Sequence, residues 1–215
     1  HSLDVAAVGW WLLDPKLPLC KKLAHQLQVE PTWLQSWFCF CLALHDLGKF
    51  SSAFQNLATN LSTQLVPATS NMPYDQRHDS LGFSLWQKVV RDQWLSTSTC
   101  DAGKVKSLLK PWFEIVTGHH GIPPQDIADI RPHQGSDAFF CDTDKQAAIS
   151  FCHDVSEQFL TGLDLTVLGD KAFNKKVKKH SWSLAGVAVL ADWLGSDQRH
   201  FKYHVVPMAL SVYWH

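Results

Sequence analysis

Charged residues of either sign are scarce in this sequence, and basic residues do not outnumber acidic ones. Only 18% of the 215 residues are charged, and 19 Lys and Arg side chains stand against 20 Asp and Glu, which gives a net charge of -1. This balance provides no overall electrostatic attraction for a polyanion. Because 46% of the residues are hydrophobic, intrinsic disorder is excluded and a packed core is expected.

Several functional signatures are also missing. No stretch approaches the roughly 20 apolar residues of a membrane helix, so we expect a soluble, cytoplasmic protein without a membrane partner. No G-x-x-x-x-G-K-[ST] loop occurs, so ATP is not expected to bind here. A G-x-S-x-G elbow is absent, which leaves a serine nucleophile without support. The six cysteines form no C-x-x-C pair, which argues against a zinc knuckle and favours reduced, buried thiols.

Helical periodicity dominates what is present, and strand-like alternation is hard to find before the last fifteen residues. Apolar positions three and four apart predict a buried helix from Thr32, preceded by Pro31 and closed by Gly48. Further helices are predicted over 2–13, 52–61, 78–94, 104–117, 143–160 and 181–194. Loops are expected over 62–74 and 121–135, a short strand over 201–206, and the start of a helix from 208.

The pattern contains no repeat and no second core, so we expect a single all-α domain over residues 1–215. The chain opens on His1 instead of Met and ends within an apolar helical pattern. We therefore expect it to be a piece of a longer product that continues into a further domain.

The densest chemical signal is the segment LALHDLGKF over residues 42–50. His45 and Asp46 are adjacent at the end of a helix, about 100° apart, so both side chains can reach one ion. Gly48 permits a sharp turn after the pair, and Lys49 brings an ammonium to the rim, where it could meet a phosphate. In isolation, such a pair is more often a core histidine bonded to its neighbour, with the lysine in solvent.

Two further segments carry candidate ligands. His119 and His120 are consecutive imidazoles between two glycines and can converge on one ion, although two solvated loop histidines are the alternative. Asp192 is the one charged residue in the run LAGVAVLADWL. A carboxylate buried in such a helix is costly unless a cation lies beside it, whereas a helix-end Asp in solvent is the competing interpretation.

The other histidines and the tryptophans divide by context. His1 heads an amphipathic segment and His78 opens a predicted helix, and both are candidates for the same cluster. The remaining histidines lie in polar or terminal contexts and are expected at the surface: His25, His133, His153, His180, His200, His204 and His215. Core spacing favours burial, rather than base stacking, for Trp33, Trp37, Trp86 and Trp193.

The order His, His-Asp, His, His-His, Asp resembles the HD metal-dependent phosphohydrolase superfamily. The strings HDLGKF, VTGHHG and LADWLGSD are most similar to the HD nuclease domain of the CRISPR-associated nuclease-helicase of type I systems, in particular its type I-E branch. The similarity runs from His1 to about Trp214. It implies an all-α HD domain with the metal site at the centre of the helix bundle and a helicase part, covalently or non-covalently linked, beyond it.

The resemblance also implies a ligand set. One ion would be held by His1, His45, Asp46 and Asp192, and a second would share Asp46 and take His78, His119 and His120. Asp46 and Lys49 are the implied catalytic residues, and Lys49 would also bind the substrate phosphate. Mixed His and carboxylate ligation suits one or two Mn, Fe, Co, Ni or Zn ions better than Mg, which remains a further candidate.

The implied reaction is hydrolysis of phosphodiester bonds in single-stranded DNA, after the crRNA-guided Cascade complex has opened the target duplex. Two ions can activate a water and stabilise the leaving oxygen of such a reaction. The alternatives are an HD phosphohydrolase acting on nucleotides or cyclic nucleotides, and a catalytically silent helical module that docks a partner. The basic run over 171–180 either contacts DNA or forms a solvated helix face.

Overall fold

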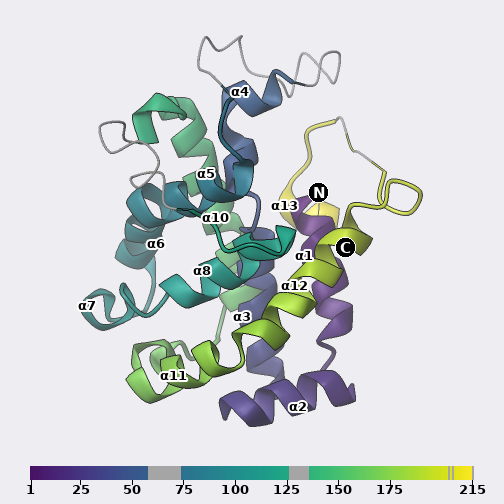
Figure 1. The fold of residues 1–215 in the computed structure, drawn as a ribbon, viewed down its shortest axis with the longest axis vertical. Coiled ribbons are helices and arrows are strands. Elements are labelled where there is room, and N and C mark those ends of the chain that lie inside the picture. Colours follow the sequence, from purple (N-terminus) through teal and green to yellow (C-terminus); the bar gives the residue numbers. More distant parts are fainter. Residues whose placement is uncertain (58–73, 126–135, 203, 205, 215) are drawn as a thin grey trace.

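The computed structural model describes residues 1–57, 74–125, 136–202, 204 and 206–214. These residues form helices and turns and contain no strand, which confirms the predicted all-α class (Figure 1). The longer helices are α1 (Ser2–Leu12), α2 (Pro18–Leu27), α3 (Pro31–Ala43), α5 (His78–Leu85), α6 (Arg91–Thr97), α8 (Lys110–Thr117), α10 (Asp142–Leu160), α11 (Lys171–Lys179) and α12 (Ser181–Gly195). The short elements are η1 (Leu47–Phe50), α4 (Ser52–Gln55), η2 (Trp86–Val90), α7 (Ala102–Val105), η3 (Gly118–His120), η4 (Ser136–Ala138), η5 (Thr166–Gly169) and α13 (Leu210–Trp214).

The central element is α3, whose sequence is apolar on every side. Pro31 starts the helix, and ten of its residues are buried. A helix that is hydrophobic all round needs partners on all faces. They are α1, α2, α8 and α10, which surround α3 (Figure 1). Trp33 and Trp37 on α3 and Trp86 on η2 lie in this core, as predicted.

Two glycines let α1 approach its neighbours closely. A side chain at Gly9 would lie 2.2 Å from the Leu42 side chain on α3, and one at Gly195 would lie 2.8 Å from the backbone of Val5. Since Gly195 ends α12 beside Val5 near the start of α1, the two helices run side by side in opposite directions (Figure 1). This arrangement brings His1 next to Asp192.

A second close crossing joins η1 to α5. A Cβ at Gly48 would lie 1.9 Å from the carbonyl oxygen of His78, and one at Gly82 would lie 2.7 Å from the Gly48 nitrogen. The two backbones are thus in direct contact. This contact places Asp46, in the turn after α3, beside His78, the first residue of α5.

Several sequence predictions need correction. Trp193 is 71% exposed, not in the core, because it lies on the outer face of α12. α2 was not predicted, although its buried Cys20, Leu23, Ala24 and Leu27 are spaced three and four apart. The predicted helix over 104–117 is broken, since α7 ends at Val105 and α8 starts at Lys110.

The remaining predicted elements fare as follows. α1, α10, α12 and α13 match their predicted positions, and the helix over 78–94 is continuous through η2 into α6. The helix predicted over 52–61 is observed as the short α4, and residues after 57 lie outside the described ones. Residues 201, 202, 204 and 206 form no strand, and most of the two predicted loops falls outside the described residues. Among the helices of the described part, none is long and apolar enough to cross a bilayer.

Candidate metal centre

His45 and Asp46 occupy the turn between α3 and η1. Both side chains are only 1% exposed, at the centre of the helix bundle. The Nδ1 atom of His45 lies 2.6 Å from the carbonyl oxygen of Leu42. Because a carbonyl only accepts, Nδ1 carries a proton and donates to it, and Nε2 is the nitrogen that faces Asp46.

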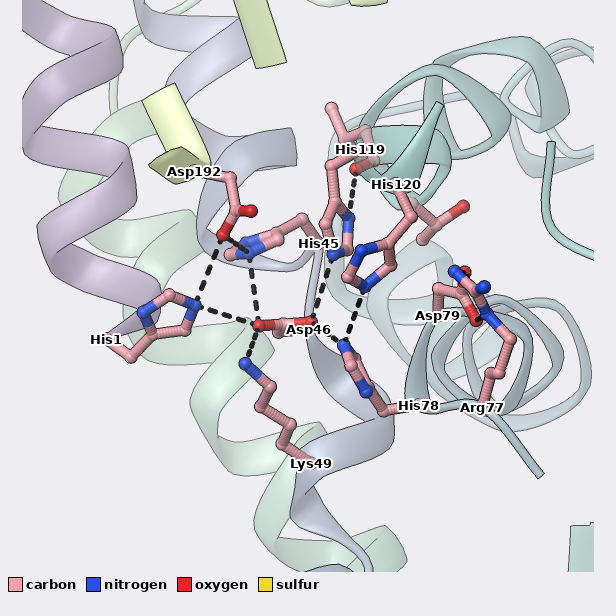
Figure 2. Close-up of polar contacts among 12 residues, drawn as sticks. His1, His45, Asp46, Lys49, Arg77, His78, Asp79, His119, His120 and Asp192 are labelled. Carbon is pink, nitrogen blue, oxygen red and sulfur yellow. Dashed lines mark hydrogen bonds and ion pairs between the residues drawn. The ribbon is translucent and has the colours of Figure 1, made fainter. Parts of the chain in front are cut away.

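One oxygen of Asp46 faces the first group of candidate ligands (Figure 2). Its Oδ2 lies 2.9 Å from His1 Nε2 and 3.2 Å from His45 Nε2. The same two nitrogens are each 3.5 Å from Asp192 Oδ1. The ligand atoms of these four residues all lie within 4.8 Å of one another, which is close enough for one ion to bind them together.

The other oxygen of Asp46 faces the second group. Its Oδ1 lies 3.4 Å from His78 Nε2 and 3.7 Å from His119 Nε2. His120 Nε2 is 3.1 Å from His78 Nε2, so the three imidazoles converge. Their nitrogens also lie within 4.8 Å of one another. Figure 2 shows the Asp46 carboxylate between the two groups.

The sequence predicted all seven residues as ligands, and the fold brings them together from distant segments. His1 precedes α1, Asp192 lies near the end of α12, and His119 and His120 follow α8 in η3. His119 is held by Nδ1, which lies 3.0 Å from the carbonyl oxygen of Val116, so its Nε2 also faces Asp46.

The charges and the burial of the cluster shift the pKa values of its members strongly. Burial disfavours the charged form of His45, but Asp46 and Asp192 outweigh it and raise the pKa of His45 to about 9. Against the cost of burial, the neighbouring His45, His1 and Lys49 hold the pKa of Asp46 well below its ordinary value. Burial and the charge of His45 lower the pKa of His119 to about 4.

The ligand groups fit a divalent cation. Among the described residues, the buried atoms that make no hydrogen bond include His1 Nε2, His45 Nε2 and both oxygens of Asp46. These four atoms meet one another, and Lys49 meets Asp46, as ion pairs that lack hydrogen-bond geometry, and a cation at their centre would compensate their burial better. Imidazole nitrogens together with carboxylate oxygens are the donor set that divalent transition metals accept.

Lys49 lies at the rim of the site. Its ammonium is 2.5 Å from Asp46 Oδ2, and 29% of its side chain is exposed. It also lies 5.8 Å from the centre of the Phe54 ring. Lys49 is therefore paired with a buried carboxylate while it remains accessible to a ligand from solvent.

Sequence reasoning missed the residues that support the ligands. Tyr74 Oη lies 3.3 Å from His78 Nδ1. Asp79, itself buried, accepts from the Ser80 backbone N–H and pairs with Arg77 at 2.8 Å, which secures the start of α5. Neither residue carries a signal in the sequence, because each depends on a partner's position in space.

The other described histidines lie outside the two ligand groups. His25, His200 and His204 are exposed, as predicted, whereas His153 and His180 are half-buried. His133 and His215 fall outside the described residues.

Comparisons with known proteins identify relatives. A family model described as the HD domain of Cas3 matches residues 1–201. The CRISPR-associated endonuclease/helicase Cas3 of Escherichia coli (strain K12) is 33% identical over 213 residues, which cover 91% of this chain and 23% of that protein. The chain thus spans about a quarter of that relative's length.

Solved structures share the fold. A crystal structure of a CRISPR-associated protein matches with a TM-score of 0.71 and 22% identity, over all of this chain and 23% of the other. A chain from a CRISPR RNA-guided surveillance complex in a pre-nicking state matches with a TM-score of 0.59 and 21% identity, over 93% of this chain and 22% of the other. With the family match over residues 1–201 and the ligand order HD, H, HH, D assembled around one carboxylate, the chain belongs to the Cas3 HD domain family.

Proposed function

We propose that this chain is the HD nuclease domain of a type I CRISPR system and hydrolyses phosphodiester bonds in single-stranded DNA with divalent metal ions. The observation that carries the proposal is the position of Asp46, whose two oxygens each face a separate group of ligand atoms. A carboxylate in this position can bridge two ions. Such a pair is the usual apparatus for hydrolysing a phosphate diester without a protein nucleophile.

In this proposal, His1, His45, Asp46 and Asp192 hold one ion, and His78, His119 and His120 hold the second together with Asp46. When bound, two such ions lower the pKa of a water and neutralise charge on the phosphate and the leaving oxygen. The residues keep the ions at fixed positions, because their side chains come from a rigid, closely packed bundle. The donor set favours Mn, Fe, Co, Ni or Zn over Mg.

Lys49 has a separate role in the proposal. Its ammonium is the accessible positive charge closest to Asp46, at 2.5 Å. When ions replace it as partners of Asp46, it is free to turn toward a phosphate oxygen at the rim. Lysine suits this task because it acts as a compact point charge on a flexible stem.

Partners are proposed from the relatives. The E. coli relative is named an endonuclease/helicase, and one chain of the same fold belongs to a CRISPR RNA-guided surveillance complex. We therefore assign residues 1–215 to a nuclease domain that acts in the cytoplasm with a helicase part and a Cascade complex. A net charge of -1 fits this division, since DNA affinity would then come mainly from the helicase part.

The basic run over 171–180 does not adjoin the candidate site. On α11, Phe173, Asn174 and Val177 are buried, and the lysines lie on the outer face. Figure 1 places α11 at the end of the bundle opposite the N-terminus, where His1 lies. A solvated helix face therefore accounts for this run better than contact with DNA at the reaction centre.

The test is cleavage of circular single-stranded DNA by the purified chain with Mn²⁺, Co²⁺ or Ni²⁺. We expect Asp46→Asn, which keeps the shape of the side chain, to reduce cleavage by at least 10³-fold, within the range measured for essential catalytic groups. Asp154→Ala, on the exposed face of α10, is the matched control and should cleave like the wild type.

Each alternative has its own outcome in this test. Release of phosphate from free nucleotides without cleavage of the circle would replace the DNA substrate by a small one. Absence of both activities, together with absence of metal binding, would identify a silent helical module instead. Cleavage retained in Asp46→Asn would refute the assignment of the site.

A further inference from the structure

The ligand histidines differ in what holds the nitrogen that faces away from Asp46. His45 and His119 each present Nδ1 to a backbone carbonyl, of Leu42 and Val116 respectively. A carbonyl only accepts, so Nδ1 carries a proton in both rings and Nε2 is the nitrogen left to face Asp46 or an ion. The backbone therefore holds these two rings in place without help from a side chain at Nδ1.

His78 is different, because its Nδ1 meets a side chain. The hydroxyl of Tyr74 lies 3.3 Å from this nitrogen. On the other side of the ring, Nε2 lies 3.1 Å from His120 Nε2 and 3.4 Å from Asp46 Oδ1. When Nδ1 donates to Tyr74, Nε2 is free to accept from His120 or to bind an ion. Histidine ligands in metal sites usually donate their second nitrogen to such a partner.

The Tyr74 ring is itself held in place. It packs edge-on against Phe54, with ring centres 5.3 Å apart, and Phe54 also contacts the His78 ring at 5.8 Å. The three rings form one contiguous group beside Asp46.

Phe54 is anchored in turn by α10. The Phe54 N–H donates to the Ser51 hydroxyl at the start of α4. The neighbouring Ser52 donates its N–H and its hydroxyl to the buried carboxylate of Asp144, at 3.0 and 2.5 Å. A chain of contacts therefore runs from α10 through α4 to the hydroxyl that faces His78.

We propose that Tyr74 is a positioning residue that fixes the ring orientation of His78 and accepts a hydrogen bond from its Nδ1–H when Nε2 binds an ion, and so prepares the His78, His119 and His120 group for that ion. The proposal rests on the proposed function of this cluster as a metal site. It assigns Tyr74 no contact with the substrate.

The test uses Tyr74→Phe, which removes the hydroxyl and keeps the ring on Phe54. We expect the metal-free protein, titrated with Co²⁺ in a calorimeter, to bind one of two ions 10- to 100-fold more weakly, as losses of outer partners do in other sites. The other ion should bind as in the wild type. The variant His78→Ala lacks the ligand itself and gives the affinity expected when the weakened site is lost completely. Ser156→Ala, which deletes a hydroxyl bonded to Trp94, is the matched control and should change neither affinity.

A second readout does not require any ion. Nitrogen NMR of the metal-free protein should show a different Nδ1 chemical shift for His78 in Tyr74→Phe than in the wild type, because the contact with the hydroxyl is lost. An unchanged His78 Nδ1 shift or wild-type Co²⁺ affinities in this variant would overturn the role of Tyr74. If the wild type binds no Co²⁺ at all, the proposed function fails, and the Nδ1 shift still shows whether Tyr74 positions His78.

Discussion

Asp46 is a buried carboxylate with a different environment at each oxygen. Its side chain is 1% exposed, and in the metal-free chain its compensating charges are the Lys49 ammonium and the protonated imidazoles around it. Divalent ions would take over this compensation. Metal binding to this residue therefore requires that protons leave the first group of ligands.

The first prediction concerns the pH dependence of metal-free stability. The pKa of His45 is about 9 in the folded chain, above its ordinary value of 6.5. Because the folded chain holds the His45 proton more tightly than the unfolded chain does, protonated His45 stabilises the fold fully below pH 6.5. This contribution to the free energy of unfolding disappears as the pH rises through 9. We expect the melting temperature in the presence of a chelator to fall between these pH values.

The measurement is thermal unfolding at several pH values with a chelator and with Mn²⁺. In Mn²⁺ the fall should weaken or reverse, since ions bind the neutral imidazole. His45→Gln, which cannot titrate, should flatten the metal-free curve. A metal-free melting temperature that is constant over this range would contradict the role given to His45.

At the scale of elements, the crossing of η1 and α5 decides whether the second ligand group can form. Any side chain at Gly48 would meet the backbone of His78 and Gly82, and backbone cannot move aside as a side chain can. This glycine is required by proximity, since its φ is not positive in the described chain.

The second prediction is therefore made for Gly48→Ala. We expect it to destabilise the fold by about 1–3 kcal/mol, the usual cost of overpacking. It should also lower the affinity for the ion of the His78, His119 and His120 group, because α5 and its His78 must shift away from Asp46. Urea unfolding and metal titration measure the two effects.

Gly186→Ala is the matched control, because a Cβ at Gly186 in α12 meets nothing. Removing a glycine from a helix interior should stabilise the protein by about 0.5–1 kcal/mol. Equal losses of stability in the two variants would contradict the importance of the crossing.

The sequence predicted some features of the helices correctly and others not. Apolar periodicity predicted α3, α10 and α12 because their buried positions recur three and four apart over several turns. It failed for Trp193, because α12 is apolar on nearly every side and periodicity cannot then tell the inner face from the outer. It also could not reveal the break between α7 and α8, which tertiary packing decides.

For the site, the family resemblance predicted seven candidate ligands, among them Asp46 as the shared carboxylate, and the fold brings these residues together. The resemblance could not find Tyr74, Asp79 or Asp144, whose roles arise from contacts across the fold. Tyr74 lay at the edge of a predicted loop, and Asp144 in the first turn of a predicted helix. Single supporting side chains leave no periodic trace.

At the scale of the whole molecule, the tryptophans range from fully buried to strongly exposed. Trp37 is fully buried and packs against Phe40, Trp94 and Trp112. Trp182 is 82% exposed on α12. The free energy of folding should depend on the first kind and hardly on the second.

The third prediction quantifies this contrast. Trp37→Ala should lower the free energy of unfolding by about 3–5 kcal/mol, because it leaves a large cavity in the core. Trp182→Ala should change it by no more than about 0.5 kcal/mol, as exposed substitutions usually do. Denaturant unfolding of both variants measures the difference. A similar loss of unfolding free energy in both variants would contradict the prediction, because Trp182 would then stabilise the fold as much as Trp37 does.

The meeting of His1 with Asp192 beside Asp46 has a consequence for biosynthesis. The first ligand leaves the ribosome before any other, and the last follows 191 residues later. Until α12 has emerged, the nascent chain has no complete first ligand group and cannot hold an ion there. If the proposed function holds, an unfinished copy lacks a complete site, and translation itself sets the earliest moment at which that site can be filled.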